Sequence, residues 1–284
     1  MTQNVFETIS SQYFDLTHSE KKVADYVLGH RIDAQYMSIS ELAEECEVAD
    51  ATISRFCRRL GLPGYNAFKL ELARASMDAR AALPRTPALS VSSDGFAALC
   101  KQVLGDNISA LEQTFQLVDR EALRQAVDLL EQARRVACIG QGGSMVLAME
   151  AWTLFSMVSS KFIYVPDSHL QINTLAGMEP DEAVLYFSYS GSTRDLQDAL
   201  EVARTRQVPV ILVSRFPKSP GGQQANVVLQ CGVNESPLQP GSVSARMAQL
   251  LILDLLFQQL CSRNRDQVHE RRSRIAEAAA KKHL

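Results

Sequence analysis

Four hydroxyl side chains stand within six residues in the segment 188–193, directly after an apolar run that is typical of a buried strand. A serine or threonine hydroxyl donates a hydrogen bond without carrying charge, which suits the oxygen atoms of a phosphate group. The junction of a strand with a following helix adds backbone N–H groups and the positive end of the helix dipole. Since no lysine or arginine precedes Arg194 in the segment, we expect a phosphate to be held here without a charged side chain. The predicted ligands are Ser188 and Ser190, where the strand ends and the helix begins.

Ordinary helix capping is the alternative explanation of the same segment. Ser192 is followed three residues later by Asp195, which matches a capping box at a helix start. Capping accounts for one or two of the hydroxyl groups and leaves the others to bind a ligand. A nucleophilic serine on a GxSxG turn is excluded, because position 188 is serine rather than glycine.

A second loop with a glycine-rich start follows the apolar run 136–140 and reads Gly140-Gln-Gly-Gly-Ser144. Its first residues match part of the GxGxxG pattern of dinucleotide-binding proteins. The sixth position is Met145 instead of glycine, and the candidate acid, Asp167, comes later than that pattern requires. We therefore expect neither a nicotinamide nor a flavin cofactor.

Short apolar runs alternate with helical stretches from residue 135 onward, and this alternation must position both loops. Continuous apolar strands separated by helices predict a parallel sheet covered on both faces, an α/β fold of three layers. In such open sheets, ligands bind beyond the carboxyl ends of the strands, where both loops lie. The helix expected at 245–260 is apolar nearly all round, which fits either the core or a subunit contact. The expected strands are 136–140, 161–166, 183–188, 208–214 and 226–231, with helices near 144–159, 168–177 and 193–206.

The segment 51–70 is basic in an acidic chain, since it holds four bases and no acid while the net charge of the whole chain is −3. It includes a helix whose apolar positions Ile53, Phe56, Cys57 and Leu60 recur at helical spacing. A short helix that begins at Ser38 or Ser40 precedes it, and a helix capped by Thr17 or Ser19 comes earlier. Two short helices joined by a tight turn, the second of them basic, predict a mainly helical domain with a helix-turn-helix.

The exposed side of the second helix is then expected to enter the major groove of DNA, where side-chain donors meet phosphates and base edges. One more helix follows, in which Tyr65 and Phe68 are expected to pack on the bundle. The predicted DNA contacts are Thr52, Ser54, Arg55, Arg58 and Arg59 on the helix and Lys69 after it.

The segment 75–95 contains two prolines and ends in Ser-Ser-Asp-Gly, which is typical of an interdomain linker. We expect a helix-turn-helix domain over residues 1–77, a linker over 78–95, and an α/β domain with flanking helices over 96–284. The flanking helices are expected at 96–117 and 120–134, and the basic tail 263–284 is expected to be a solvated helix end.

The six cysteines are widely spaced and form no CxxC pair, which indicates reduced, mostly buried thiols and no zinc site. Neither clustered histidines nor another metal motif is found. No apolar stretch approaches the roughly 20 residues that span a bilayer, and the first residues lack a signal-peptide pattern. We expect a cytoplasmic protein that binds neither a metal nor a cofactor and does not associate with a membrane.

The N-terminal stretches LTHSEKKVADYVL, SISELAEECEVADATISRFCRRLGLPGY and FKLELA resemble the DNA-binding domain of the RpiR family of bacterial transcriptional regulators. The resemblance covers nearly all of residues 1–76. It is specific, because spacing and residue types agree across three consecutive helices. It implies that operator DNA is a partner. Helix-turn-helix proteins usually read two half-sites as symmetric dimers, so a homodimer or homotetramer is expected.

The C-terminal stretches VACIGQGGSMVLAMEAW, VPDSHLQINTLAG, EAVLYFSYSGSTRDLQDALEVARTRQVPVILVSR and SARMAQLLILDLLF resemble the SIS domain, a phosphosugar-binding module. The resemblance covers about residues 125–260. It implies that Ser144 contacts a phosphosugar effector and that Ser188, Ser190 and Thr193 cradle its phosphate. Position 143, often a hydroxyl residue in that family, is Gly143 here, and the resemblance assigns Glu235 as an acceptor for sugar hydroxyls.

Two functions are compatible with these patterns. One is a DNA-binding regulator that senses a phosphorylated sugar and controls genes of carbohydrate metabolism. The other is an aldose–ketose sugar phosphate isomerase with an accessory helical domain, which requires a base beside the substrate carbonyl. Glu150 and His169 are the candidate bases, but His169 near a helix start is better explained as a packing or capping residue. We therefore predict the regulator and no enzymatic activity.

Overall fold

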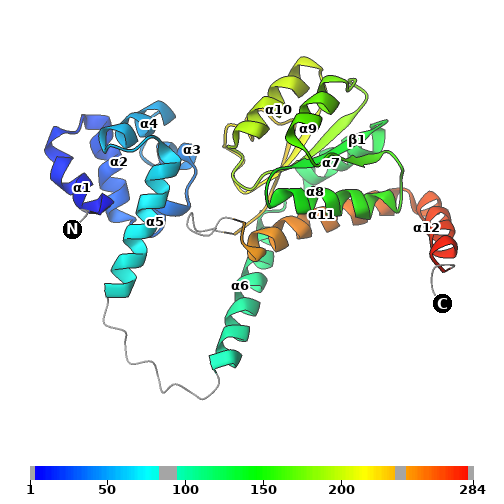
Figure 1. The fold of residues 1–284 in the computed structure, drawn as a ribbon, viewed down its shortest axis with the longest axis horizontal. Helices are drawn as coiled ribbons and strands as arrows, with labels where there is room; N and C mark the ends of the chain where they lie inside the picture. The colour runs from blue at the N-terminus through cyan, green and yellow to red at the C-terminus, as the bar shows by residue number, and fades with distance from the viewer. Residues whose placement is uncertain (1–3, 83–94, 234–240, 281–284) are drawn as a thin grey trace. The chain divides into compact units, whose positions relative to one another are not determined.

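The computed structural model describes residues 4–82, 95–233 and 241–280. The chain forms two compact units, and the division between them falls between Leu104 and Gly105, inside a helix. The first unit contains the N-terminal helices and the second contains the sheet (Figure 1). In the described part of the chain, no helix is both long and apolar enough to cross a membrane.

The first unit is a helical bundle around one apolar core. The sequence predicts all of its α-helices except the first, whose short apolar pattern precedes the first expected helix. Ile9, Val23, Leu42, Phe56 and Phe68 are fully buried, and the Phe56 and Phe68 rings meet edge to face at 5.7 Å. The elements are α1 (Val5–Gln12), α2 (His18–Gly29), α3 (Ile39–Glu45), α4 (Asp50–Arg59) and α5 (Tyr65–Ala82), with short 3-10 helices at Tyr13–Asp15 and Ala34–Tyr36.

Capping boxes fix where the helices of this bundle begin. Of the two expected capping residues at each start, Thr17 caps α2 with Glu20, and Ser38 caps α3 with Glu41. In each pair the side chain of the cap accepts from the backbone, and the glutamate accepts from the N–H of the capping residue, so two otherwise unpaired donors are satisfied. These caps set the short helix α3 in place directly before α4.

The turn between α3 and α4 carries a residue in the left-handed backbone region. Glu47 has φ +51°, a conformation that costs most residues other than glycine about 1 kcal/mol or more. Its carboxylate lies 2.8 Å from the Lys22 ammonium of α2, so the turn is tied to the neighbouring helix. The turn brings α3 and α4 together as a helix-turn-helix.

The second unit contains a five-stranded parallel sheet in the order β2-β1-β3-β4-β5, which confirms the predicted fold class (Figure 1). The strands are β1 (Val136–Gly140), β2 (Phe162–Tyr164), β3 (Ala183–Phe187), β4 (Val210–Ser214) and β5 (Val227–Gln230). The helices are the part of α6 (Gly95–Leu117) from Gly105 onward, α7 (Arg120–Gln132), α8 (Ser144–Ser156), α9 (Ser168–Ala176), α10 (Arg194–Thr205), α11 (Val243–Arg263) and α12 (Arg265–Ala280).

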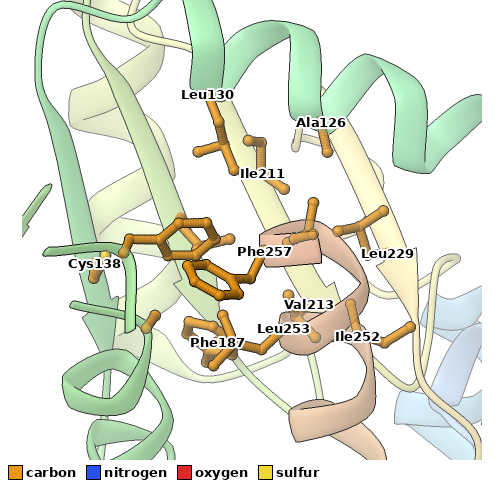
Figure 2. Close-up of a cluster of buried hydrophobic side chains, with 14 of the residues drawn as sticks. Ala126, Leu130, Cys138, Phe187, Ile211, Val213, Leu229, Ile252, Leu253 and Phe257 are labelled. Carbon is orange, nitrogen blue, oxygen red and sulfur yellow. The ribbon is translucent and has the colours of Figure 1, made fainter. Parts of the chain in front are cut away.

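Alternate residues of the strands face the two covering layers. One face packs against α7, α8 and α11, as Figure 2 shows for Phe187, Val213 and Phe257. The other face carries Ile139 and Tyr186 toward α9 and α10. Each strand is therefore buried on both sides, which explains why the strands are continuous apolar runs.

The nearly all-apolar helix α11 belongs to the core. Its residues Ala248, Ile252, Leu256 and Phe257 are buried against the sheet and α8. Phe257 meets Phe155 of α8 edge to face at 5.6 Å, and Phe155 stacks on Phe162 of β2 at 4.5 Å. Of the two alternatives for this segment, the core is the one that the structure supports.

The helix α6 presents large apolar side chains to solvent over much of its length. Only its C-terminal part packs firmly, through Ala110 and Thr114, and the Thr114 hydroxyl accepts from the Gly232 N–H at 3.0 Å. The exposed apolar residues on α6 are Phe96, Leu99, Val103, Leu104, Ile108 and Phe115.

Candidate functional sites

The two loops that the sequence singled out lie side by side at one edge of the sheet. In the parallel register of β1 and β3, Gly140 pairs with Phe187, so the residues that follow these two strands leave the sheet together. The strand order reverses direction between β1 and β3, which is the switch point where open α/β sheets bind ligands. The geometry therefore places both loops where a ligand is expected.

The first loop, residues 141–143, is tightly constrained at its start. A Cβ on Gly140 would lie 2.5 Å from the Ser144 carbonyl oxygen, so only glycine allows α8 to begin this close to the strand end. Gly142 has φ +55°, which also favours glycine. Gly143 is the N-cap of α8 and offers no side chain to cap it. The N-terminus of α8 is consequently open at the sheet edge.

Gln171 of α9 holds this loop in place, and sequence reasoning missed it. Its side chain is 2% exposed and donates to the carbonyl oxygens of Val165 at 2.8 Å and Gly140 at 3.3 Å. Its amide oxygen accepts from Gln141 Nε2 at 2.6 Å. A glutamine in the helix that follows the next strand is no recognisable signal in the sequence, because only the fold brings it to the loop.

The second loop, residues 188–193, depends on Gly191. This residue has φ +60°, and a Cβ on it would lie 2.0 Å from the Ser219 hydroxyl oxygen. Its carbonyl oxygen accepts from the Gly221 N–H at 2.8 Å. The Tyr189 hydroxyl donates to the Val233 carbonyl at 2.6 Å. The loop is thus fixed by contacts with the segment after β4 and with the end of β5.

The hydroxyl groups of the two loops differ in how they are engaged. Ser188 is 5% exposed, Ser190 is half-buried, and Thr193 is exposed as the N-cap of α10. Among the described residues, the hydroxyls of Ser144, Ser188 and Thr193 make no hydrogen bond. The Ser190 hydroxyl accepts from the Ser192 N–H at 3.3 Å and still has a proton to donate. All four hydroxyls are therefore available as donors.

The capping box expected from Ser192 and Asp195 is wrong. Thr193 occupies the N-cap of α10 and makes no side-chain capping bond. The Ser192 hydroxyl donates instead to the Ser190 carbonyl at 3.1 Å. The tight turn at Gly191 shifts the helix start by one residue, so Ser192 lies outside it.

An arginine that the sequence did not suggest stands beside the first loop. Nη1 of Arg246, in the first turn of α11, lies 3.8 Å from the point where a Cβ of residue 143 would stand. One turn later, Gln249 donates to the Val213 carbonyl of β4 at 3.4 Å, which holds this end of α11 against the sheet. Arg246 follows the site residues at a long distance in the chain, and no local pattern marks it.

The remaining predicted ligand and catalytic residues are Glu235, Glu150 and His169. Glu235 lies outside the described residues. Glu150 of α8 and His169 of α9, the candidate bases for an isomerase, are both exposed. The part of the chain that the structure describes contains no group of histidine, cysteine, aspartate and glutamate side chains that could hold a metal ion.

The helix α4 presents three arginines to solvent. Arg55, Arg58 and Arg59 are exposed and Ser54 is half-buried, whereas Thr52 is only 7% exposed. The expectation that Thr52 lies on the exposed face is wrong, because the first turn of α4 tucks against the bundle. The Thr52 hydroxyl instead accepts from Arg55 Nη2 at 3.1 Å.

The arginines of α4 have different partners. Arg59 pairs with the buried carboxylate of Glu20 at 3.4 Å and also donates to the Asp15 carbonyl. Burial raises the pKa of Glu20, but hydrogen bonds from Thr17 and the charges of Arg59 and Arg55 outweigh it and lower that pKa. Arg58 makes no ion pair or hydrogen bond with any described residue. Lys69 is half-buried on α5.

Both units match protein-family models. The model of the helix-turn-helix domain of the rpiR family matches residues 3–78, and the SIS domain model matches residues 129–259. The chain thus carries a helix-turn-helix domain of the rpiR family followed by an SIS domain. Both resemblances predicted from the sequence are thereby confirmed.

Relatives that span nearly the whole chain are regulators of transcription. The HTH-type transcriptional regulator HexR of Escherichia coli K12 is 27% identical over 275 residues, which cover 97% of this chain and 94% of HexR. These relatives support the predicted helix-turn-helix transcriptional regulator over the isomerase.

Solved structures share the fold. The structure of the Vibrio vulnificus NanR protein complexed with ManNAc-6P matches 99% of this chain and 100% of its own, with a TM-score of 0.86 and 24% identity. A putative sugar-phosphate isomerase of Listeria monocytogenes matches only 62% of this chain, with a TM-score of 0.55 and 17% identity. The match to NanR extends over both domains, whereas the match to the isomerase covers less than two thirds of the chain.

Proposed function

We propose that this regulator binds operator DNA through α4 and that a phosphorylated sugar, bound by the loops after β1 and β3, changes its affinity for the operator. The observation that carries the proposal is the pair of adjacent loops at the switch point, where the hydroxyls of Ser144, Ser188 and Thr193 have no partner among the described residues. The SIS match and the ManNAc-6P bound by the structurally similar NanR support the same chemistry.

The proposed effector site consists of Gly143 and Ser144 in the first loop and Ser188, Ser190 and Thr193 in the second, together with Glu235. Uncharged donors surround a phosphate at the junction of strands and helices, where helix dipoles also favour an anion. Ser188 is 5% exposed and its hydroxyl has no partner among the described residues, so it can donate to a ligand oxygen.

The proposed DNA surface consists of Ser54, Arg55, Arg58 and Arg59 on α4, with Thr52 packed beneath it and Lys69 on α5. Arg58 is the residue with most freedom to reach a phosphate or a base edge, since it has no partner in the described part of the bundle. Arg55 and Arg59 each hold an internal contact, which orients their guanidinium groups on the helix surface.

The effector changes DNA binding only if it prefers one arrangement of the protein over another. A ligand that bound both arrangements equally would leave operator affinity unchanged. The proposal therefore requires that the phosphorylated sugar and the operator each alter the affinity of the other by the same factor.

We further propose that the regulator works in the cytoplasm as a homodimer or homotetramer. Reading two half-sites requires two copies of α4. The apolar side chains exposed on α6 offer a surface for a second copy, and Leu111 and Phe115 also line a groove of about 610 Å³ with Leu251 of α11. Burying such side chains against another helix stabilises an assembly by the hydrophobic effect.

The test combines thermal stability, DNA binding and turnover on the full chain. Differential scanning fluorimetry against a panel of pentose, hexose and amino-sugar phosphates is expected to show stabilisation by a member of the panel, because a ligand stabilises the state it binds. The same compound should shift binding to operator fragments selected from genomic DNA. Robust isomerisation of a panel member, or operator binding that no panel member alters, would contradict the proposal.

A further inference from the structure

Arg246 occupies an electrostatically unusual position. Its Nη1 lies 3.8 Å from the point where a Cβ of Gly143, the N-cap of α8, would stand. The side chain is half-buried and makes no ion pair or hydrogen bond with any described residue. Among the described residues, the charge of Arg246 therefore has no counter-ion beside the first loop.

The N-terminus of α8 disfavours a cation such as Arg246 beside it. The N-terminus of a helix carries about half a positive elementary charge, so a cation beside it is repelled. Cations usually lie at the other end of a helix. An anion bound between Arg246 and the α8 N-terminus would be attracted both by the guanidinium and by the helix dipole.

A second observation at the same site points to a ligand. Ser188, which leaves β3 beside the first loop, is 5% exposed, and its hydroxyl has no partner in the described part of the chain. The hydroxyls of Ser144 and Thr193 are unpaired as well. Hydroxyl donors and a cation without partners among the described residues thus converge at one edge of the sheet.

We infer that Arg246 is a further effector-binding residue and that its guanidinium binds an oxyanion of the effector at the first loop. The inference rests on the proposed function of the two loops and adds a charged contact to a site that otherwise holds neutral donors. The planar guanidinium donates two parallel hydrogen bonds to a phosphate or to a carboxylate. The effector class is therefore a phosphorylated sugar, and the oxyanion at Arg246 is either its phosphate or an acid group elsewhere on it.

Position 143 fits this assignment. Glycine leaves the space between the loop and Arg246 empty, whereas a serine side chain there would stand in contact with the guanidinium. The glycine, which departs from the hydroxyl residue often found in the SIS family, gives an oxyanion direct access to the arginine.

The experiment titrates the full-length wild-type chain and three variants with a matched pair of probes. Glucose 6-phosphate and 6-phosphogluconate share a phosphate and differ by a carboxylate, and inorganic phosphate serves as the third probe. Affinity is measured by calorimetry and by the shift of the melting temperature. The variants are Arg246→Gln, Arg246→Lys and the control Arg204→Gln, which removes an exposed arginine without a described partner from the opposite end of α10.

The expected result is at least about tenfold weaker binding to Arg246→Gln, since a hydrogen bond to a charged group contributes roughly 1.5–3 kcal/mol. Arg246→Lys should recover part of the affinity, because it keeps the charge but not the fork. Arg204→Gln should bind like the wild type. Equal losses for both sugar probes assign the arginine to the phosphate, and a loss confined to 6-phosphogluconate assigns it to the carboxylate.

Two outcomes would overturn the inference, and they can be told apart. If the wild type responds to a probe and Arg246→Gln responds equally, the arginine binds no oxyanion and the proposed function stands. If neither these probes nor any member of the sugar-phosphate panel binds the wild type, the phosphate-binding role of the loops fails and the inference fails with it. The melting temperature of each variant without probes shows that the variant is folded.

Discussion

The carboxylate of Glu20 joins the start of α2 to the last turn of α4 through Arg59. One oxygen accepts from the Thr17 N–H at 2.9 Å and from its hydroxyl at 2.8 Å, and the other lies 3.4 Å from Arg59 Nε. The helix that is proposed to read DNA is thereby fixed by a charge that is itself buried. One ionic contact therefore links the stability of the bundle to the helix proposed to bind DNA.

Acid is expected to weaken the N-terminal domain through Glu20. Its pKa is lowered in the folded state, so its contribution to stability is present above the ordinary glutamate pKa of about 4.3 and is lost as pH falls toward the lower folded value. Chemical denaturation at pH 7 and at lower pH, followed by circular dichroism, measures this loss. Glu20→Gln should be less stable at pH 7 and should lose less stability on acidification. Equal pH dependence of the variant and the wild type would contradict the assignment.

Arg58 and Arg59 are neighbours on α4, but alanine substitutions of the two should have different effects on DNA affinity and on stability. Arg58→Ala removes a side chain without a described partner, so operator affinity should fall while the free energy of unfolding changes by no more than about 0.5 kcal/mol. Arg59→Ala leaves the buried Glu20 carboxylate without its cation and should cost about 1–3 kcal/mol of stability. Fluorescence anisotropy with operator DNA and denaturation curves separate the two. Unchanged DNA affinity of Arg58→Ala would count against α4 as the recognition helix.

A β-branched residue at position 47, in the turn before α4, should destabilise the domain. Glu47 has φ +51°, and a valine there adds steric strain and loses the contact with Lys22, so Glu47→Val should cost more than about 1 kcal/mol. Glu47→Gly is the matched control: it relieves the strain, loses an exposed ion pair and adds entropy to the unfolded chain. These effects oppose one another, and its stability should stay close to that of the wild type. Denaturation midpoints of the two variants test the turn, and equal midpoints would refute this account of it.

Gln171 should affect effector binding without contacting the effector. Gln171→Leu leaves the carbonyl groups of Gly140 and Val165 and the amide of Gln141 without their partner and should cost about 1–3 kcal/mol. The first loop then loses its support, so the affinity for a phosphorylated sugar should fall as well, whereas the operator affinity of the unliganded protein should not. An effector titration that matches the wild type would show that the loop holds its shape without this side chain.

Ser190 and Ser192 offer a matched pair within one loop. Ser190→Ala removes a hydroxyl from the proposed phosphate site and should weaken the response to a phosphorylated sugar about tenfold or more while leaving basal DNA binding unchanged. Ser192→Ala removes a hydroxyl that is bonded to the Ser190 carbonyl and should have a much smaller effect. Equal effects of the two substitutions would return the segment to a purely structural role.

Much of the fold could be predicted from the periodicity of apolar residues and from the residues that cap the helices. The apolar runs such as 183–188 became parallel strands because burial on both faces leaves no room for polar residues, and the caps Thr17 and Ser38 were readable because they bond within four residues. Both loops could be located as well, since the edge of the sheet follows from the strand pattern alone.

Contacts between distant segments could not be read in the same way. Arg246, Gln171 and the partner of Arg59 depend on which helices meet, and the sequence carries no local mark of that. Ser192 was assigned to a capping box because its spacing fits one, but the left-handed turn at Gly191 moves the helix start past it. Thr52 was placed on the exposed face of α4 although the first turn of that helix packs on its own bundle.

The glycines of the two loops determine where this sensor can be retuned by protein engineering. Positions 140 and 191 have no space for a side chain, because even a methyl group would overlap the Ser144 carbonyl or the Ser219 hydroxyl. At position 143 a methyl group meets only the end of a flexible arginine. A library aimed at new effectors should therefore vary residue 143 together with Arg246 and leave the other two glycines untouched.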